Sequence, residues 1–227
     1  MDGSYTGTVD SVFAQERLAA HRMAGKHAVA KRGLDILGAL AIATAFSPII
    51  IATMVIMAFQ KGPIFFGHVR IGRDGKPFRC YKFRTMVPDA GRVLSELLES
   101  CPASRAEWLL DFKLKNDPRI TPIGRFLRKT SLDELPQLWN VLRGEMSLVG
   151  PRPIVADELI RYGRGARFYL ANRPGLTGLW QVSGRNDVDY GRRVALDRAY
   201  TENASVLMDL RIIARTVLVV LRLRGAY

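Results

Sequence analysis

The sequence predicts an α+β fold that is predominantly α-helical and belongs to a monotopic membrane protein, which enters a bilayer from one face without crossing it. Two observations lead to this fold class. Residues Ile36 to Phe59 form a run of 24 residues without a charge, and apolar side chains recur at helical spacing through much of the remaining chain. We expect a polar segment at 1–28, a re-entrant membrane helix at 29–62 and a cytosolic domain at 63–227.

The composition limits the partners of this chain. Its 227 residues include 34 Lys and Arg against 21 Asp and Glu, which gives a formal net charge of +13. Such an excess favours a polyanionic partner: an anionic membrane surface, a phosphorylated substrate or a nucleic acid. Cys80 and Cys101 form no CxxC pattern and are expected to be free thiols, and the three scattered histidines argue against a zinc site. The polar start of the chain lacks the apolar core of a secretory signal peptide.

The apolar run has two features that are unusual for a simple spanning helix. Ser47-Pro48 lies at its middle, where proline removes an amide donor and clashes with the preceding turn. Basic residues, which prefer the cytoplasmic side, flank both ends, with Lys31 and Arg32 before the run and Lys61 after it. These features favour a re-entrant helical hairpin broken at Ser47-Pro48, in which the Ser47 hydroxyl satisfies a freed backbone group. A single transmembrane helix is the alternative.

A basic β-hairpin is predicted over residues 68–86. Asp74-Gly75 is a strong turn signal, and the apolar and aromatic residues on both sides of it favour strands. Among the many cations of this hairpin, Lys82 and Arg84 are candidates for binding phosphate. A solvated charged face, or attraction to anionic lipid headgroups, is the alternative explanation of these cations.

Amphipathic helices are predicted in two further stretches. Residues 89–112 are expected to form one or two helices, interrupted near Pro102, with leucines that belong to the core. Residues 203–227 are expected to form a basic amphipathic helix, with an apolar stripe from Leu207 to Leu221. Such a helix lies in the membrane interface, or it packs on the core or on a partner.

Asp133 and Glu134 form an acidic doublet in a basic setting. A capping box with Ser131 as the cap is the structural explanation of this pair. Pro136 argues against it, because proline belongs at the first position of a helix. The acids are therefore expected on an irregular turn at the helix start, with their carboxylates pointing outward. Arg128 and other nearby cations are expected to keep the carboxylates ionised.

Phosphate chemistry would explain such a doublet. An ionised aspartate can attack phosphorus and form an acyl phosphate. An adjacent carboxylate can hold magnesium, because Mg²⁺ prefers oxygen ligands and usually shares them with substrate phosphates. One nucleophile, Asp133, and one metal ligand, Glu134, would account for two adjacent acids.

The chain resembles the bacterial sugar transferases, a family of monotopic phosphoglycosyl transferases. The resemblance covers roughly residues 29–227. It rests on several motifs in order: KRGLDILGA, the mid-membrane Ser47-Pro48, RIGRDGKPFRCYKFRTM, KNDPRITPIGRFLRKTSLDELPQLWNVLRGEMSLVGPRP and RPGLTGLWQVSGRN. Each motif alone is weak, whereas their combination in this order is highly specific. Larger members of the family carry a multi-span N-terminal region, so this chain is expected to be the short form.

The resemblance implies a ping-pong reaction and a role for each candidate residue. Asp133 would attack the β-phosphate of a UDP-sugar, so that UMP leaves and a covalent phospho-sugar remains. Undecaprenyl phosphate would then accept the phospho-sugar, in the first membrane step of exopolysaccharide or other glycan synthesis. Glu134 would hold Mg²⁺. The residues implied in phosphate binding are Arg128, Arg185, Lys82, Arg84 and Arg152.

The resemblance also implies partners and a location. The donor would be UDP-glucose or UDP-galactose, and the protein would lie among the lipids of the bacterial inner membrane, at its cytoplasmic face. No nucleic-acid partner is expected, because the long apolar run disfavours a soluble nucleic-acid binder. The oligomeric state is left open, with a homodimer allowed. The alternative functions are a membrane phosphatase or pyrophosphatase acting on a lipid-linked phosphate, and a non-enzymatic basic membrane adaptor.

Overall fold

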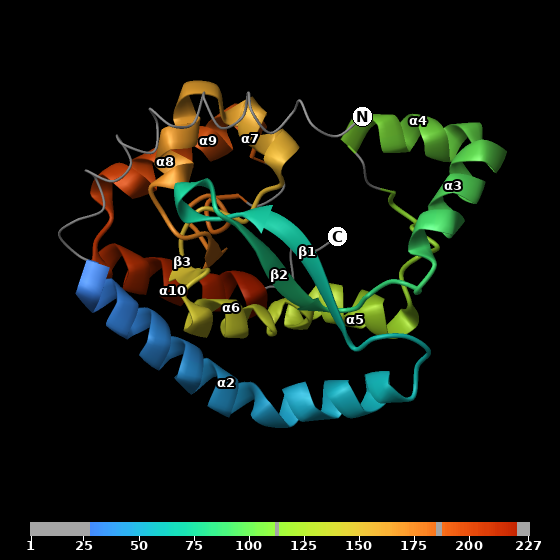
Figure 1. Cartoon of the computed structure of the whole chain (residues 1–227), viewed down its shortest axis with the longest axis horizontal. Coiled ribbons are helices and arrows are strands. Elements are labelled where there is room, and N and C mark those ends of the chain that lie inside the picture. Colours follow the sequence, from blue (N-terminus) through green and yellow to red (C-terminus); the bar gives the residue numbers. More distant parts are fainter. Residues whose placement is uncertain (1–27, 112–113, 185–187, 222–227) are drawn as a thin grey trace.

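One long helix, α2 (Ala28–Ala58), extends along one side of the molecule (Figure 1). The computed structural model describes residues 28–111, 114–184 and 188–221, so the predicted polar segment lies outside it except for its last residue. By length and composition α2 could cross a membrane, and only 11% of its most apolar stretch is buried. A core helix of a soluble protein would be mostly buried, so packing in a core does not explain the exposed apolar surface of α2.

Pro48 bends α2 without dividing it. The helix continues through Pro48, and its two halves run in different directions in Figure 1. Pro48 has no amide hydrogen to donate to the carbonyl of Thr44, which instead accepts a hydrogen bond from the Ser47 hydroxyl at 2.8 Å. Proline is expected to kink or break a helix, and here it bends one continuous helix, so the predicted break into a hairpin of two helices is corrected and the predicted role of Ser47 is confirmed. The re-entrant course through a membrane stays a prediction.

The N-terminal half of α2 is fastened to the body by charged side chains. The Lys31 ammonium donates to the buried Asp209 carboxylate at 2.8 Å. The buried Asp35 carboxylate accepts the Ser147 hydroxyl, also at 2.8 Å. Arg32 donates to two carbonyl groups at the end of a neighbouring helix, where a cation satisfies unpaired acceptors. These buried polar contacts fix the position of the helix on the body.

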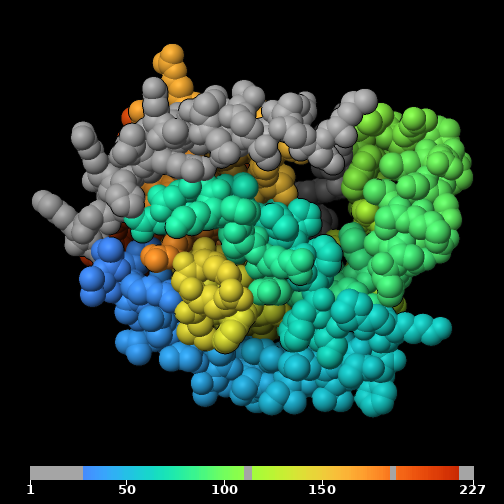
Figure 2. All heavy atoms as spheres, in the orientation of Figure 1, coloured from blue at the N-terminus to red at the C-terminus, as the bar shows by residue number. Residues whose placement is uncertain are grey.

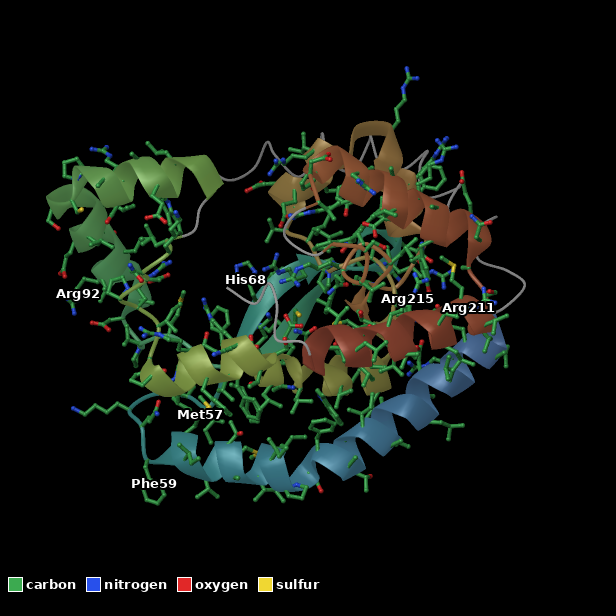
Figure 3. The ribbon with its side chains drawn as sticks, turned by 180° about the vertical axis from the view of Figure 1, so that it is seen from behind. Met57, Phe59, His68, Arg92, Arg211 and Arg215 are labelled. Carbon is green, nitrogen blue, oxygen red and sulfur yellow. The ribbon has the colours of Figure 1, made fainter. Side chains whose placement is uncertain are left out.

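The C-terminal half of α2 is fastened to the same body by apolar packing. Met57 is fully buried in a cluster with Phe83 and Leu127. Figure 3 shows Met57 on the side of α2 that faces the body, whereas Phe59, which is 89% exposed, points away. In Figure 2 the atoms of α2 form a band along one edge of the molecule. Both ends of the apolar helix therefore belong to a single packed unit.

The predicted β-hairpin is confirmed. Strands β1 (Phe65–Ile71) and β2 (Pro77–Phe83) pair antiparallel. They are joined by the short 3₁₀ turn η1 (Arg73–Gly75), in which Asp74 and Gly75 have φ of 58° and 76°. Positive φ at two successive positions is the geometry that Asp-Gly sequences favour in tight hairpins.

Short elements form the rest of the body, and they are α5 (Pro122–Thr130), η2 (Leu132–Glu134), α6 (Gln137–Arg143), β3 (Ser147–Val149), α7 (Ala156–Tyr162), η3 (Gly163–Gly165), α8 (Ala166–Leu170), β4 (Gly175–Thr177), α9 (Tyr190–Asn203) and α10 (Val206–Leu221). The parallel pair of β3 and β4 was not predicted. The main core joins α2, α6, β3 and α10 around residues such as Ala39, Val141 and Ile212.

Residues 89–112 form two helices, α3 (Ala90–Ser100) and α4 (Pro102–Asp111), divided where Pro102 predicts. The prediction that their leucines belong to the core is wrong. No residue of α3 is buried, and Leu109 is 68% exposed. The two helices pack on each other at the edge of the molecule (Figure 1).

Helix α10 confirms the predicted C-terminal helix and defines its faces. It packs on the core through Asp209 and Ile212, which are 1% and 2% exposed. Ile213 of the predicted stripe packs against the main core, whereas Leu207, Leu210 and Val217 lie on the outer side and are 58%, 47% and 52% exposed. These exposed residues therefore do not contact the core of the protein itself, and contact with a membrane interface or a partner stays a prediction.

Candidate active site

The acidic doublet lies on the turn η2, directly before α6. Ser131 has a left-handed backbone, with φ of 59°, and its side chain makes no cap hydrogen bond. Helix α6 begins after Pro136, which occupies its N-cap position. The capping box is thus absent from this turn, and the predicted irregular turn at the helix start is confirmed.

Asn140 holds α6 against the edge of β2. Its side chain is fully buried, accepts from the Tyr81 amide at 3.0 Å and donates to the Arg79 carbonyl at 2.6 Å. The side-chain amide thus pairs with the strand as a neighbouring strand would. Lys82 follows Tyr81 in β2, and the acidic doublet precedes α6. The hydrogen bonds of Asn140 to β2 therefore bring Lys82 next to the acids.

Lys82 bridges the two carboxylates. Its Nζ lies 2.6 Å from Glu134 Oε1 and 3.5 Å from Asp133 Oδ2. Arg152, in the loop after β3, extends to 3.9 Å from the same Glu134 oxygen. The structure therefore brings four of the predicted site residues together from three separate parts of the chain.

The two acids lie in different environments, and one prediction about them is wrong. Asp133 is 7% exposed, whereas Glu134 is half-buried. Burial raises the pKa of Asp133 above its ordinary value, and the positive charges of Lys82 and Arg128 oppose that rise without cancelling it. The expectation of an outward carboxylate whose ionisation is favoured by its cations is thus corrected for Asp133, because desolvation outweighs the cations.

Arg128 is positioned by the close approach of α5 to the end of the hairpin. A Cβ on Gly124 would lie 2.0 Å from the carbonyl oxygen of Thr85, so only glycine fits at this contact. One turn later, Arg128 Nε donates to the Thr85 hydroxyl at 2.9 Å. Asp133 and Arg128 interact electrostatically, and the contact of Arg128 with phosphate stays a prediction.

For the other two predicted phosphate ligands, Arg84 and Arg185, the structure gives no contact with the acids among the residues it describes. Arg84 is buried, and its guanidinium donates to the carbonyl of Lys61 in the turn after α2. This contact gives Arg84 a structural role, and its phosphate contact stays a prediction. Arg185 lies outside the described residues.

A polar cleft adjoins Glu134, and it is lined by Arg70, Cys80, Lys82, Glu134, Gln137, Arg152, Pro153, Gly175, Leu176 and Gln181. Three cations and two side-chain amides thus face one acid. Burial raises the pKa of Cys80 to about 11, which keeps its thiol protonated and unreactive. Sequence reasoning missed Arg70, Gln137 and Gln181; Arg70 and Gln181 lie in segments that only the folded chain brings together.

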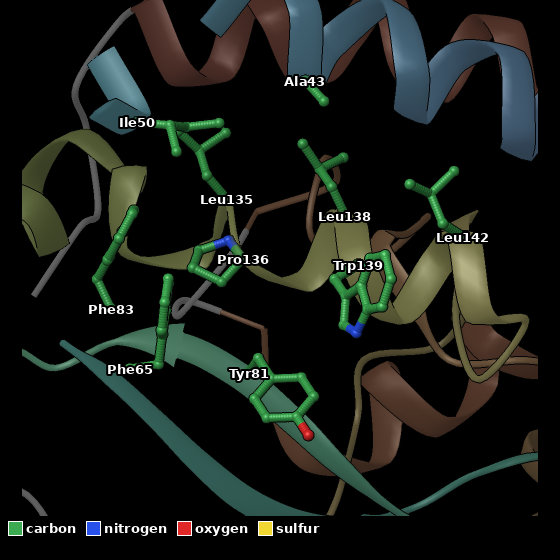
Figure 4. A pocket seen from close by; sticks show the side chains of 10 residues that line it. All are labelled: Ala43, Ile50, Phe65, Tyr81, Phe83, Leu135, Pro136, Leu138, Trp139 and Leu142. Atoms are coloured by element: carbon green, nitrogen blue, oxygen red, sulfur yellow. The ribbon is translucent and has the colours of Figure 1, made fainter. Parts of the chain in front are cut away.

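An apolar pocket of about 430 Å³ lies on the other side of β2 (Figure 4), and its walls are formed by Ala43, Ile50, Phe65, Tyr81, Phe83, Leu135, Pro136, Leu138, Trp139 and Leu142. Successive residues of a strand point to opposite faces. Lys82 accordingly lines the polar cleft, while Tyr81 and Phe83 line the apolar pocket. The acidic doublet therefore has a polar cavity and an apolar cavity as close neighbours.

The doublet fits a magnesium ion better than a transition metal. No group of three or more His, Cys, Asp and Glu side chains gathers anywhere in the described ranges. Mg²⁺ needs only one or two carboxylates when substrate phosphates and water complete its ligands. The Lys82 ammonium shows that a cation is stable beside Glu134 Oε1, and an ion at this oxygen would have to displace it.

Comparison with known proteins identifies the family. Residues 26–223 match the model of the family described as "Bacterial sugar transferase". The chain belongs to this family of bacterial sugar transferases. The resemblance inferred from the motifs is thereby confirmed.

Several relatives of this sugar transferase carry functional names. The chain is 57% identical over 197 residues to "Undecaprenyl-phosphate galactose phosphotransferase" of Salmonella typhimurium, an alignment that covers 87% of this chain and 41% of the relative. It is 48% identical over 228 residues to "Exopolysaccharide production protein ExoY" of Sinorhizobium fredii, with both chains fully covered. It is 39% identical over 203 residues to "UDP-glucose:undecaprenyl-phosphate glucose-1-phosphate transferase" of Klebsiella pneumoniae, covering 85% of this chain and 40% of the relative. The chain thus spans about two fifths of the Salmonella and Klebsiella proteins.

Proposed function

We propose that this sugar transferase moves a hexose 1-phosphate from a UDP-sugar to undecaprenyl phosphate and releases UMP. The observation that carries the proposal is the buried Asp133 carboxylate beside Glu134, at the edge of a cleft lined by Arg70, Lys82 and Arg152. Such a lining suits a substrate with two phosphates, because several cations can share its negative charge, and the cleft of about 30 Å³ has to widen to admit it.

In the first step, a carboxylate oxygen of Asp133 attacks the β-phosphorus of the UDP-sugar. The bond from this phosphorus to the oxygen that bridges the two phosphates breaks, and UMP leaves with that oxygen. A phospho-sugar is then bonded to Asp133 as an acyl phosphate. The raised pKa of Asp133 makes the ionised form more basic and thus a stronger nucleophile once the substrate is bound.

In the second step, a phosphate oxygen of undecaprenyl phosphate attacks the same phosphorus. The bond to Asp133 breaks, the free carboxylate returns, and undecaprenyl diphospho-sugar forms. No proton has to be supplied in either step, because an anionic oxygen attacks and an anionic oxygen leaves. One phosphate site can therefore serve donor and acceptor in turn.

Cationic side chains hold the phosphates in this scheme. Lys82 and Arg152 already lie within 4 Å of Glu134, and the positive charge of Arg128 acts on Asp133. We place Arg70 in the same group because it lines the cleft. Arg185 belongs to the proposal through the family motif alone.

Glu134 would hold Mg²⁺ together with phosphate oxygens of the substrate. When bound, this ion would neutralise charge that develops on the transferring phosphoryl group. Glu134 suits this role better than Asp133, because it is the more exposed acid and lines the cleft.

The bent apolar helix supports a location at the inner membrane, on its cytoplasmic face. A straight spanning helix would carry one end across about 30 Å of hydrocarbon. In this chain both halves of α2 pack on one body, through Lys31 and Asp35 at one end and Met57 at the other. This arrangement favours a protein attached from one side, with catalysis at the membrane surface.

We propose UDP-galactose as the first donor to test, followed by UDP-glucose. The relatives with galactose in their names are 57% and 54% identical to this chain, and the relative with glucose is 39% identical. Purified protein would be incubated with undecaprenyl phosphate, Mg²⁺ and each UDP-sugar, and UMP release and lipid product would be measured. Absence of UMP with every donor contradicts the proposal, and release of inorganic phosphate instead indicates a phosphatase.

A further inference from the structure

We propose that the apolar pocket between α2 and α6 binds the isoprenoid tail of the lipid phosphate acceptor. This inference rests on the function proposed above and adds where the acceptor lies. The pocket has a volume of about 430 Å³, within the range of about 300–1,000 Å³ that is usual for ligand sites. Its lining is formed by aliphatic and aromatic side chains, which suits a hydrocarbon chain and no charged ligand.

The pocket lies against the apolar helix α2, which forms part of its lining. Ala43 and Ile50 of α2 form one wall, and Figure 4 shows their side chains directed toward α6. Other side chains of the same stretch of α2, such as Leu40 and Phe46, are 48% and 38% exposed. A tail in the pocket therefore lies at the same depth as the surface that α2 offers to lipid, and it need not leave the hydrocarbon layer to reach the protein.

The pocket also lies next to the proposed nucleophile. Leu135 and Pro136, which line it, follow the acidic doublet directly in the chain. Three peptide steps separate Asp133 from Pro136, so their Cα atoms are at most about 11 Å apart. A lipid phosphate has an anionic head and an apolar tail, and this segment presents the polar cleft and the apolar pocket to them side by side.

The first test fills the pocket without changing the polar cleft. Ala43→Phe places a ring in the pocket, and Ala41→Phe adds the same ring two residues away, at an exposed position of α2. The UMP burst from UDP-sugar without acceptor reports the first step alone, and KM for undecaprenyl phosphate and for geranyl phosphate reports the second.

We expect Ala43→Phe to keep the UMP burst, to raise KM for undecaprenyl phosphate about tenfold or more, and to change KM for the short acceptor much less. Ala41→Phe should behave as wild type. An unchanged preference for the long acceptor in a folded Ala43→Phe protein overturns the tail site. A wild-type protein that gives no UMP burst contradicts the proposed function instead, so the two failures are distinct.

Trp139 provides a second test that needs no catalysis. Its side chain is 57% exposed and lines the pocket, so truncation should leave the fold intact. We expect undecaprenyl phosphate to change tryptophan emission of the detergent-solubilised protein, and this change should disappear in Trp139→Phe. Dioleoyl phosphatidic acid at equal concentration carries a phosphate and acyl chains, and an equal response to it would overturn the assignment to an isoprenoid tail. Trp139→Ala also lacks the reporter, so its affinity for undecaprenyl phosphate is measured by calorimetric titration; we expect weaker binding than in wild type, and unaltered affinity also contradicts the proposal.

Discussion

Lys82 is paired more closely with Glu134 than with Asp133: its Nζ lies 2.6 Å from the Glu134 carboxylate and 3.5 Å from that of Asp133. The Lys82 ammonium thus binds the Glu134 oxygen that we propose as a magnesium ligand. A lysine and a divalent cation cannot both occupy this position, because their charges repel at such a distance. An arriving diphosphate can draw Lys82 away from Glu134 and expose the oxygen at the moment the metal is needed.

Lys82→Met should therefore strengthen metal binding in the absence of a nucleotide. We expect about a tenfold or greater gain in affinity for Mn²⁺, measured by electron paramagnetic resonance of the free ion. Lys76→Met removes the same charge from an exposed position of the hairpin and should leave Mn²⁺ binding unchanged. Equal Mn²⁺ affinity of Lys82→Met and wild type would refute the competition.

Asp133→Asn should abolish formation of lipid-linked product while the protein stays folded. The amide has nearly the same shape as the acid but cannot form the acyl phosphate, so we expect activity to fall about 10³-fold or more. Intact-protein mass spectrometry after incubation with UDP-sugar should detect a phosphohexose on the wild type and none on the variant. Asp157→Asn, at an exposed position of α7, is the matched control. Substantial turnover by purified Asp133→Asn would exclude Asp133 as the nucleophile.

Asp197 should make the stability of the protein depend on pH. Its carboxylate is 1% exposed and accepts the Tyr162 hydroxyl at 2.8 Å, while its other oxygen has no hydrogen-bond partner among the residues that the structure describes. Burial raises the pKa of Asp197 to about 7. The folded state then binds a proton that the unfolded state, with a pKa of about 3.9, has released.

The contribution of Asp197 to the free energy of unfolding should therefore be greatest below pH 4. This contribution should fall as the pH rises from 4 through 7. We expect a loss on the order of 2–4 kcal/mol in total. Asp197→Asn imitates the neutral acid, so it should melt above the wild type at pH 8 and close to it at pH 4. Thermal unfolding of both proteins in detergent measures this difference, and a difference independent of pH contradicts the prediction.

Pro48→Ala should straighten α2. The new amide can donate to the Thr44 carbonyl, which now depends on the Ser47 hydroxyl. Single cysteines at Val29 and Lys61, in a chain with Cys80 and Cys101 replaced by alanine, report on the two flanks through an impermeant maleimide. In wild type both sites should react only from the cytoplasmic side, and in Pro48→Ala one of them should become reactive from the opposite side. If both flanks of Pro48→Ala stay cytoplasmic, Pro48 is not the cause of the re-entrant course.

Local signals predicted the parts of the fold that depend on a few neighbouring residues. Asp74-Gly75 predicted the hairpin turn, Pro102 the division between two helices, and Pro136 the irregular turn that carries the acids. Each of these residues restricts the backbone at its own position, so no distant partner has to be known.

Contacts between distant segments were not predictable in the same way. Asn140 gives no sign in the sequence that it will pair with β2, and Arg70 and Gln181 are ordinary polar residues until folding brings them to one cleft. Apolar spacing predicted helical faces but not what covers them, as Leu109 and Leu207 show by their exposure. The burial of Asp133 depends on such long-range packing too, which is why the direction of its pKa shift was missed.

The ion pair of Lys31 with Asp209 joins residues 178 positions apart, and this separation has a consequence for biosynthesis. Ribosomes add about 5–20 residues per second, so α2 emerges on the order of ten seconds or more before its acidic partner exists. For that time the helix, with its uncharged run of 24 residues from Ile36 to Phe59, lacks the α10 surface that its N-terminal half packs on. The nascent helix therefore has to enter the lipid layer first, and the rest of the chain has to assemble on a helix that is already anchored.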